Sequence, residues 1–255
     1  MRSFTTAWVA FVCVFGGALL GMLLRRALPD HHLSQDSKDV LKLGAGLIGT
    51  MAALVIGLLI SSAKGSFEKQ DDELKQVAAN LILVDHLLAQ YGQETANIRD
   101  LIRRSAVNVL DLVWPEEQSR GEASRDLAAA PARVEDVDAE IRALAPTNDA
   151  QRSLQSRALE ITAAEARLRW LLFGQLGQRA IPLPFLVLLV AWLTVIFMTF
   201  GILAPRNATV IVVLLLCALS ASGAIFLILE MDQPFQGWVK VSSGPLRYAV
   251  TQLGR

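Results

Sequence analysis

Four long stretches of the chain carry no charged side chain, and each could cross a lipid bilayer. They cover residues 3–24, 43–63, 180–205 and 207–229, with lengths of 22, 21, 26 and 23 residues. A helix of roughly 20 apolar residues spans the ~30 Å hydrocarbon core of a membrane. The pattern predicts an all-α integral membrane protein with four transmembrane helices, at about 4–24, 41–63, 181–203 and 208–229.

The charged residues concentrate between the second and third of these spans. Residues 64–180 hold 34 of the 48 charged side chains in the chain. We therefore expect a first transmembrane hairpin over 1–63, a cytoplasmic helical insert over 64–180, a second hairpin over 181–230, and a C-terminal tail over 231–255. The chain has no net charge, so no strongly basic face for a nucleic-acid partner is predicted.

Basic residues near the membrane predict which side the insert occupies. Four spans place both termini and the insert on the same side. Nine basic residues lie close to the membrane on that side, and five on the other. Because cytoplasmic loops are enriched in Lys and Arg, we expect the termini and residues 64–180 to be cytoplasmic. Arginine outnumbers lysine by 18 to 6, which hints at a GC-rich bacterial genome and hence at the cell inner membrane.

The insert has a helical pattern throughout. No proline occurs between Pro29 and Pro115, and the pattern predicts one helix over 36–90 that ends near Gly92. Further helices are expected at 94–113, 134–144 and 150–175, with a polar loop at 116–133. The long helix carries an apolar seam in heptad-like spacing: Phe67, Leu74, Val77, Leu81, Val84 and Leu88. Such a seam packs against helices of its own chain or against another protein.

Small residues recur every four positions in the first two spans. The first span has Cys13, Gly17 and Gly21, and the second has Ala45, Gly49, Ala53, Gly57 and Ser61. Small residues let helix backbones approach closely in lipid. We therefore expect spans one and two to pack along these two rows.

Another face of the second span is formed by large apolar side chains, Leu47, Met51, Leu54 and Leu58. Repeated around the axis of an oligomer, this face would form an apolar constriction that gates by dewetting. Alternatively, the four side chains face lipid or a neighbouring helix, which is the usual environment of apolar residues in a span.

Two acidic residues lie at the end of the fourth span, where they oppose the helix dipole. Glu230 and Asp232 need water or a cation to compensate them, and Arg169, Arg179 and Lys64 are candidates. The sequence leaves open whether Glu230 and Asp232 form an ion-paired cluster with Arg169 and Arg179 at the membrane interface or whether the helix end is wet.

Several kinds of chemistry lack support. The spans contain no ionisable Asp, Glu, Lys, Arg or His, which disfavours ion-coupled transport. Residues 44–49 match G-x-G-x-x-G, but no strand precedes them, so no cofactor site is predicted. Adjacent His31 and His32 on a short loop are more often solvated than metal-bound, and no catalytic constellation has the required spacing. We therefore predict no enzyme, no cofactor and no metal site.

Several short runs together resemble a bacterial membrane family labelled bestrophin-like. They are KLGAGLIG at 42–49, LLISSAK at 58–64, NLILVD at 80–85, LAQYG at 88–92, RWLL at 169–172, FGILAPRN at 200–207, AIFLILE at 224–230, DQPF at 232–235 and PLR at 245–247. The resemblance implies two membrane hairpins flanking a cytoplasmic insert. True bestrophins are homopentameric anion channels whose second span lines an apolar neck, which here corresponds to Leu47, Met51, Leu54 and Leu58. The acidic calcium-clasp run of animal bestrophins has no counterpart in this chain.

Two functional hypotheses follow from the sequence. The first is a homo-oligomeric passive channel for small anions, embedded in the lipid bilayer. It is based on the charge-free spans, the long second helix and the resemblance. The second is a membrane-anchored scaffold or signalling protein whose cytoplasmic helices bind a protein partner, and it is based on the large insert and its apolar seam.

Overall fold

The computed structural model describes residues 2–29, 34–114, 134–175, 183–205, 207–235 and 237–254, apart from the side chains of residues 2, 134–136 and 167–175. Across these ranges the chain is helical and contains no β-strand, which confirms the all-α prediction. The chain divides into two compact units. The first comprises Met1–Phe67 and Arg179–Lys240, and the second comprises Glu68–Gln178 and Val241–Arg255.

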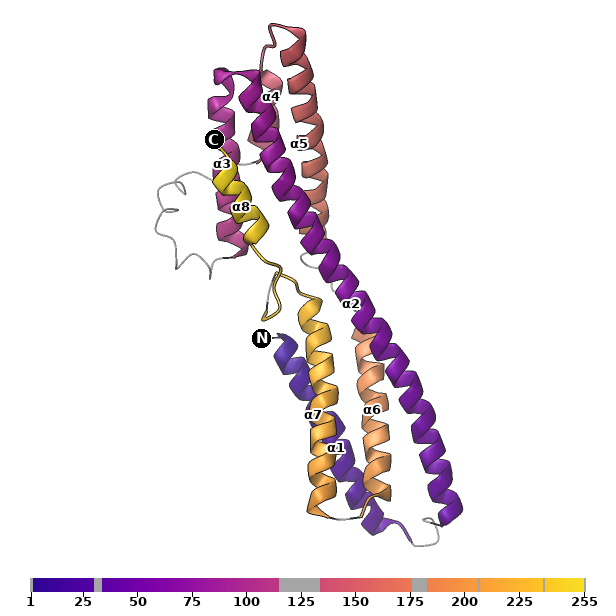
Figure 1. The fold of residues 1–255 in the computed structure, drawn as a ribbon. Helices are drawn as coiled ribbons and strands as arrows, with labels where there is room; N and C mark the ends of the chain where they lie inside the picture. Colours follow the sequence, from indigo (N-terminus) through magenta and orange to yellow (C-terminus); the bar gives the residue numbers. More distant parts are fainter. Residues whose placement is uncertain are drawn as a thin grey trace. The chain divides into compact units, whose positions relative to one another are not determined.

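Helix α2, Gln35–Tyr91, contributes to both units and runs 57 residues without interruption (Figure 1). The helix predicted over 36–90 is therefore confirmed. A 57-residue helix is far longer than the average of ~10–14 residues in globular proteins. The helix contains no proline that would break it. Its first half is apolar and its second half has heptad-like spacing, so it continues from the first unit into the second.

The first unit is built from α1 (Arg2–Ala27), the first part of α2, α6 (Leu183–Leu203) and α7 (Ala208–Met231). Helix α1 packs against both α6 and α7. The core between these helices is filled by apolar side chains, among them Val14, Leu189, Ala218 and Ile225, which are completely buried. Helix α2 adds a core row of buried residues, Ala52, Leu59 and Ala63, and its partly buried Ile48, Val55 and Ile56 pack against the same core.

The small residues of α1 lie against α6 rather than α2. A Cβ atom added to Gly17 would meet Thr194, and one added to Gly21 would meet the Met198 carbonyl. Gly49 and Gly57 of α2 have no atom within 4 Å of that position. The prediction that spans one and two pack along their small rows is therefore wrong. Residues four positions apart are separated by about 400° around an α-helix, which is about 40° more than a full turn. A row with strict four-residue spacing therefore winds around the helix and does not stay on one face.

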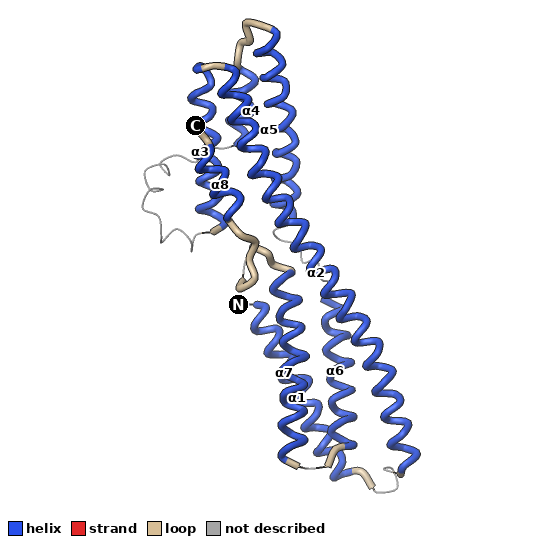
Figure 2. The backbone as a smooth tube through the Cα atoms, in the orientation of Figure 1, coloured by secondary structure: helices blue, strands red, loops and turns tan. Residues whose placement is uncertain are grey.

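The second unit combines the later part of α2 with four further helices, α3 (Ala96–Val113), α4 (Val134–Ala143), α5 (Asp149–Gln175) and α8 (Gly244–Gln252) (Figure 2). Leu74, Val84 and Leu88 of the apolar seam are buried in this unit. The seam therefore packs against helices of its own chain, which is the first of the two alternatives that the sequence allowed. The polar segment expected at 116–133 lies outside the described residues.

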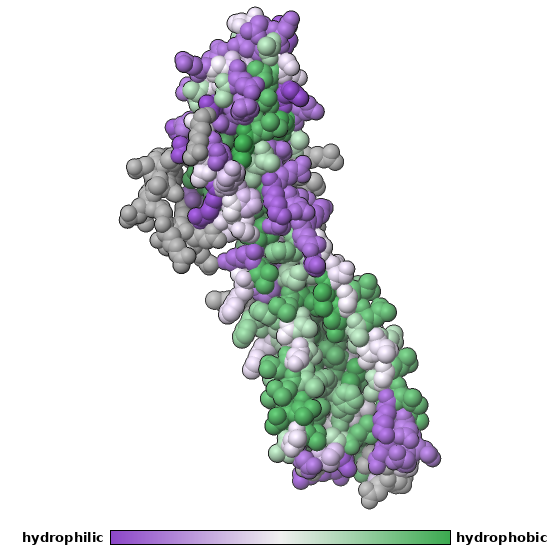
Figure 3. Space-filling model, in the orientation of Figure 1, coloured by the Kyte–Doolittle hydropathy of each residue, from purple (hydrophilic) through white to green (hydrophobic). Residues whose placement is uncertain are grey.

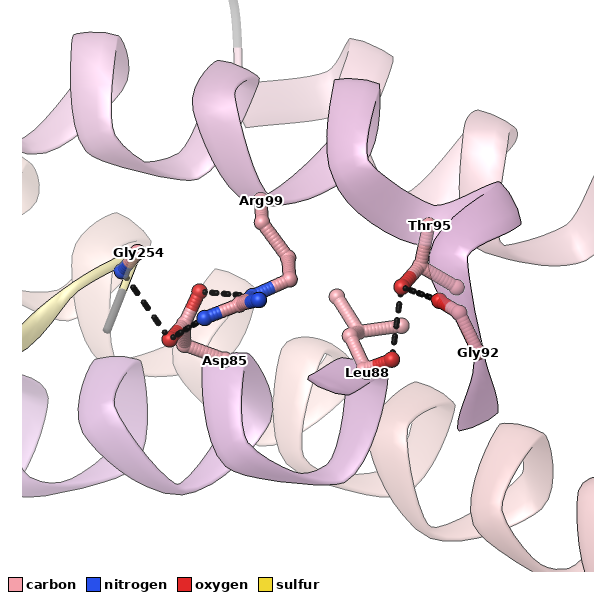
Figure 4. A network of polar contacts seen from close by, with 6 residues as sticks. All are labelled: Asp85, Leu88, Gly92, Thr95, Arg99 and Gly254. Atoms are coloured by element: carbon pink, nitrogen blue, oxygen red, sulfur yellow. Dashed lines mark hydrogen bonds and ion pairs between the residues drawn. The ribbon is translucent and has the colours of Figure 1, made fainter. Parts of the chain in front are cut away.

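The turn from α2 to α3 is held by one glycine and one threonine. Gly92 has a φ of 145°, which lies in the region that favours glycine, and the 3₁₀ turn Gln93–Thr95 follows it. The fully buried Thr95 places its Oγ1 2.6 Å from the Leu88 carbonyl oxygen and 2.8 Å from that of Gly92 (Figure 4). The hydroxyl has one proton, so it donates to one of these carbonyls at a time.

An ion pair joins α2 and α3 beside this turn. Arg99 Nε donates to Asp85 Oδ1 at 2.8 Å, and Arg99 Nη2 donates to Asp85 Oδ2 at 2.9 Å (Figure 4). The Gly254 N–H also donates to Asp85 Oδ2, at 3.2 Å. Asp85 is buried, so its carboxylate connects three segments that are distant in sequence.

The end of the chain is a packed part of the second unit. Helix α8 contacts α3, and Leu246, Ala249 and Leu253 are buried there. Trp114 Nε1 donates to the Val241 carbonyl at 3.0 Å. Residues 231–255 are thus not a simple tail, because their last part folds onto α3. Pro245, in the first turn of α8, suits a helix start since its missing N–H would have no partner there.

Candidate functional site

Within the described residues, four helices are long and apolar enough to cross a membrane, and all four belong to the first unit in their apolar parts. Apolar side chains cover the visible face of this unit, and hydrophilic side chains gather where α2 begins (Figure 3). Large apolar side chains are exposed on every one of the four helices. Such a surface is unsuited to water and matches the surface of a protein surrounded by lipid or by further copies.

Helix α2 is the least buried of the four. In its most apolar 18-residue window only 17% of the residues are buried, against 39% in α1, 39% in α6 and 28% in α7. Its contribution to the core is limited to three buried side chains and the partly buried Ile48, Val55 and Ile56. The candidate site therefore lies on α2.

The four candidate pore-lining residues lie together on α2, opposite the core row. Leu47, Leu54 and Leu58 are each more than 60% exposed, and Met51 is 48% exposed. Their spacing of four, three and four residues keeps them on one stripe of the helix. Val40 and Leu43, at 68% and 75% exposed, extend the same stripe toward the start of α2. Sequence reasoning missed these two, although the same three- and four-residue spacing leads to them. We call the six residues the leucine face.

The charges along this part of α2 have one sign. Between Asp39 and Glu68 the helix contains no acidic residue and two basic ones, Lys42 and Lys64. They flank the apolar segment at its two ends. Lys42 Nζ lies 2.9 Å from Asp39 Oδ1 in an exposed pair, so its charge is partly offset. The charge nearest to the apolar segment is therefore positive at both ends.

The residues of the small row on α2 have different environments. Ala45 is buried, whereas Ala53, Gly57 and Ser61 are exposed. The drift of about 40° per step carries the row from the core side round to the leucine face. Ser61 consequently lies next to Leu58 on the outer side of the helix, and not in a helix-packing ridge with Ala45.

The polar end of α7 is organised by Glu230. This residue is only 3% exposed, and its Oε2 accepts a hydrogen bond from the Trp238 N–H at 2.6 Å. Gly237 has a φ of 112°, and a Cβ atom there would collide with the Glu230 carboxylate. The alternative of a wet helix end is therefore wrong for Glu230. Arg179 and the side chain of Arg169 lie outside the described residues, so the predicted ion pairing with Glu230 and Asp232 stays a prediction.

The described residues contain no group of three or more His, Cys, Asp or Glu side chains that could hold a metal ion. His31 and His32, which the sequence indicates are more often solvated than metal-bound, lie outside those residues. The features of the site are thus an exposed apolar stripe and the basic residues beside it.

A family model described as the Bestrophin-like domain matches residues 12–246 of the chain. The chain belongs to the bestrophin-like family. The bestrophin-like resemblance seen in the sequence is thereby confirmed over nearly the whole chain. A comparison with curated proteins found no match.

The fold of this bestrophin-like protein is similar to a solved crystal structure, a point mutant of a bacterial bestrophin homologue from Klebsiella pneumoniae. The alignment has a TM-score of 0.63 and covers 94% of this chain and 97% of that one. The two sequences are 12% identical, so the likeness concerns the fold.

Proposed function

We propose that this bestrophin-like protein is a homo-oligomeric, passive channel for small anions in a bacterial inner membrane. The observation that carries the proposal is the leucine face of α2, an exposed apolar stripe on the least buried membrane helix. Membership of the bestrophin-like family supports a channel over an enzyme.

The pore lies between copies of the chain and not inside one copy. The core of the first unit is closed by completely buried side chains such as Val14, Leu189 and Ile225. Such packing leaves no continuous path for water or ions through a single chain. Several copies around a shared axis, each presenting its leucine face, enclose an apolar constriction that excludes water when narrow.

Transport through this pore is passive. Ion-coupled transporters carry ionisable residues within their membrane helices, because the cost of such groups is tolerated only for function. The apolar segments of this chain have none. Permeant ions therefore move down their electrochemical gradient, and the lysines that flank the apolar segment of α2 favour anions.

In the membrane, the two termini and residues 64–180 face the cytoplasm. The basic residues near the spans number nine on this side and five on the other. Exposed Trp238, which follows the end of α7, suits the membrane interface because its ring is apolar and its N–H is polar.

The assembly is tested by the protein mass of the purified particle, measured by light scattering in mild detergent with the detergent contribution subtracted. We expect a discrete particle close to five times the 27.8 kDa chain. A particle of one chain would contradict the channel, because one copy has no path for ions. It would favour the membrane-anchored scaffold, whose cytoplasmic helices bind a partner.

A further inference from the structure

The leucine face of α2 ends in two serines. Ser61 and Ser62 lie three and four residues after Leu58, so together they occupy the next position of the same stripe. Both side chains are exposed. They belong to the first unit, as the leucine face does.

These two hydroxyls differ from others in the apolar helices. Five of those others donate to a carbonyl three or four residues earlier in their own helix: Thr50, Thr194, Thr199, Ser220 and Ser222. This is the usual way for such a side chain to satisfy its donor in a helix. Among the residues that the structure describes, neither Ser61 nor Ser62 has a hydrogen-bond partner. Two exposed hydroxyls therefore lie at the end of an apolar stripe.

Their position suits an anion that leaves an apolar constriction. An anion loses hydration in such a constriction and gains from any donor at its exit. A hydroxyl donates one proton without carrying a charge, so it binds an anion without trapping it. Lys64 adds positive charge one turn from Ser61, and no acidic residue occurs in α2 between Asp39 and Glu68.

We propose that Ser61 and Ser62 form a binding site for the permeant anion at one end of the leucine face. In the oligomer each copy contributes this pair, which gives a ring of hydroxyl donors. The inference rests on the proposed function, since the ring exists only if the leucine faces share an axis. It assigns the chloride-sized anion as the ligand and the two serines as residues that determine specificity.

The first test compares anion preference in proteoliposomes. Ser61→Ala combined with Ser62→Ala removes both donors, and we expect chloride flux to fall roughly five-fold relative to iodide flux, because chloride is the more strongly hydrated ion and needs the donors more. Combined Ser61→Thr and Ser62→Thr, which keeps the hydroxyls, should retain the wild-type preference. Ser220→Ala on α7 is the matched control, because its exposed hydroxyl bonds to its own helix.

The outcomes separate the inference from the proposed function. If wild-type protein passes no anion, the proposed function fails and the inference fails with it. If the wild type conducts and the double alanine variant keeps the wild-type preference for chloride over iodide, only the inference is overturned.

A second measurement does not depend on the alanine variant folding. Ser61→Cys is introduced after the exposed native cysteines, Cys13 and Cys217, are replaced by alanine. We expect a charged, water-soluble thiol reagent to modify the new cysteine, and 100 mM chloride to slow that modification relative to gluconate. Modification at equal rates in the two salts would show that Ser61 faces lipid headgroups or bulk water, and would overturn the site.

Discussion

Gly21 of α1 and Gly201 of α6 lie against each other's helices in a reciprocal contact. A Cβ atom at Gly21 would collide with the Met198 carbonyl, and one at Gly201 would collide with the Ala18 carbonyl. The two backbones therefore approach more closely than any side chain would permit. Small residues at a crossing are a common means of helix association in lipid, where there is no hydrophobic driving force between helices.

Alanine at either glycine should destabilise the first unit. We expect Gly21→Ala or Gly201→Ala to lower the free energy of unfolding by about 2 kcal/mol, because the helices must move apart. Gly16→Ala on α1 is the matched control, since nothing lies within 4 Å of its Cβ position. Thermal unfolding in detergent measures all three variants, and equal melting of Gly21→Ala and Gly16→Ala would refute the close contact.

The ion pair between Asp85 and Arg99 should matter more than the surface pairs of the second unit. Arg99→Met leaves the buried Asp85 carboxylate without its guanidinium, and we expect a loss of about 3 kcal/mol. Arg152 pairs with Asp149 at the surface, so Arg152→Met should cost less than about 0.5 kcal/mol. Chemical denaturation of the two variants gives the comparison. Similar losses in both would mean that the Asp85 pair is not structurally important.

Replacing Tyr91 with phenylalanine should stabilise the second unit. Its side chain is buried, and its hydroxyl has no hydrogen-bond partner among the described residues. An unpaired buried hydroxyl costs free energy, so we expect Tyr91→Phe to raise the free energy of unfolding by about 1 kcal/mol. A loss of stability on this substitution would show that the hydroxyl has a partner after all.

Tyr91 should also make the stability of the second unit depend on pH. Burial raises the pKa of Tyr91 above its ordinary value, and the nearby Glu94 carboxylate adds to the increase. The unfolded chain therefore loses this proton first, so native stability falls as pH rises above ~10. Denaturant midpoints between pH 8 and 11 should fall less steeply in Tyr91→Phe than in the wild type. Parallel curves would contradict the assignment.

Trp114 is expected to hold the end of the chain on the second unit. Trp114→Phe keeps an aromatic ring but removes the donor to the Val241 carbonyl. We expect a loss of about 1–3 kcal/mol, since that buried carbonyl loses its partner. Amide hydrogen exchange should become faster over 241–253, with little change in α1. Unchanged exchange over 241–253 would show that α8 is held independently of Trp114.

The sequence predicted the helices well because the charge-free spans leave few alternatives. The bounds of α2, α3 and α5 agree with the predicted ones within a few residues. Helix α8 was missed because it is short and buries little more than Leu246 and Ala249. The contacts of Asp85 were not predictable, since Arg99 and Gly254 reach it only after α3 and α8 have packed.

The candidate site was predicted in part. The leucine face could be located because its three- and four-residue spacing follows one side of a helix. The small row could not be placed, because its strict four-residue spacing winds around α2 and carries Ser61 away from Ala45. The helix against which Gly21 packs could not be predicted either. That contact depends on which helices are neighbours, and the periodicity of a single helix does not contain this information.

Chloride flux into proteoliposomes measures whether the leucine face of α2 is the constriction of an anion pore. We expect flux above that of empty liposomes for the wild type and a several-fold increase for Leu54→Ser, because a polar side chain wets the constriction. Leu219→Ser, at a residue that is equally apolar and 55% exposed on α7, should leave the flux unchanged. Wild-type flux at the empty-liposome rate, or the same flux from both variants, would show that the leucine face does not line an anion pore.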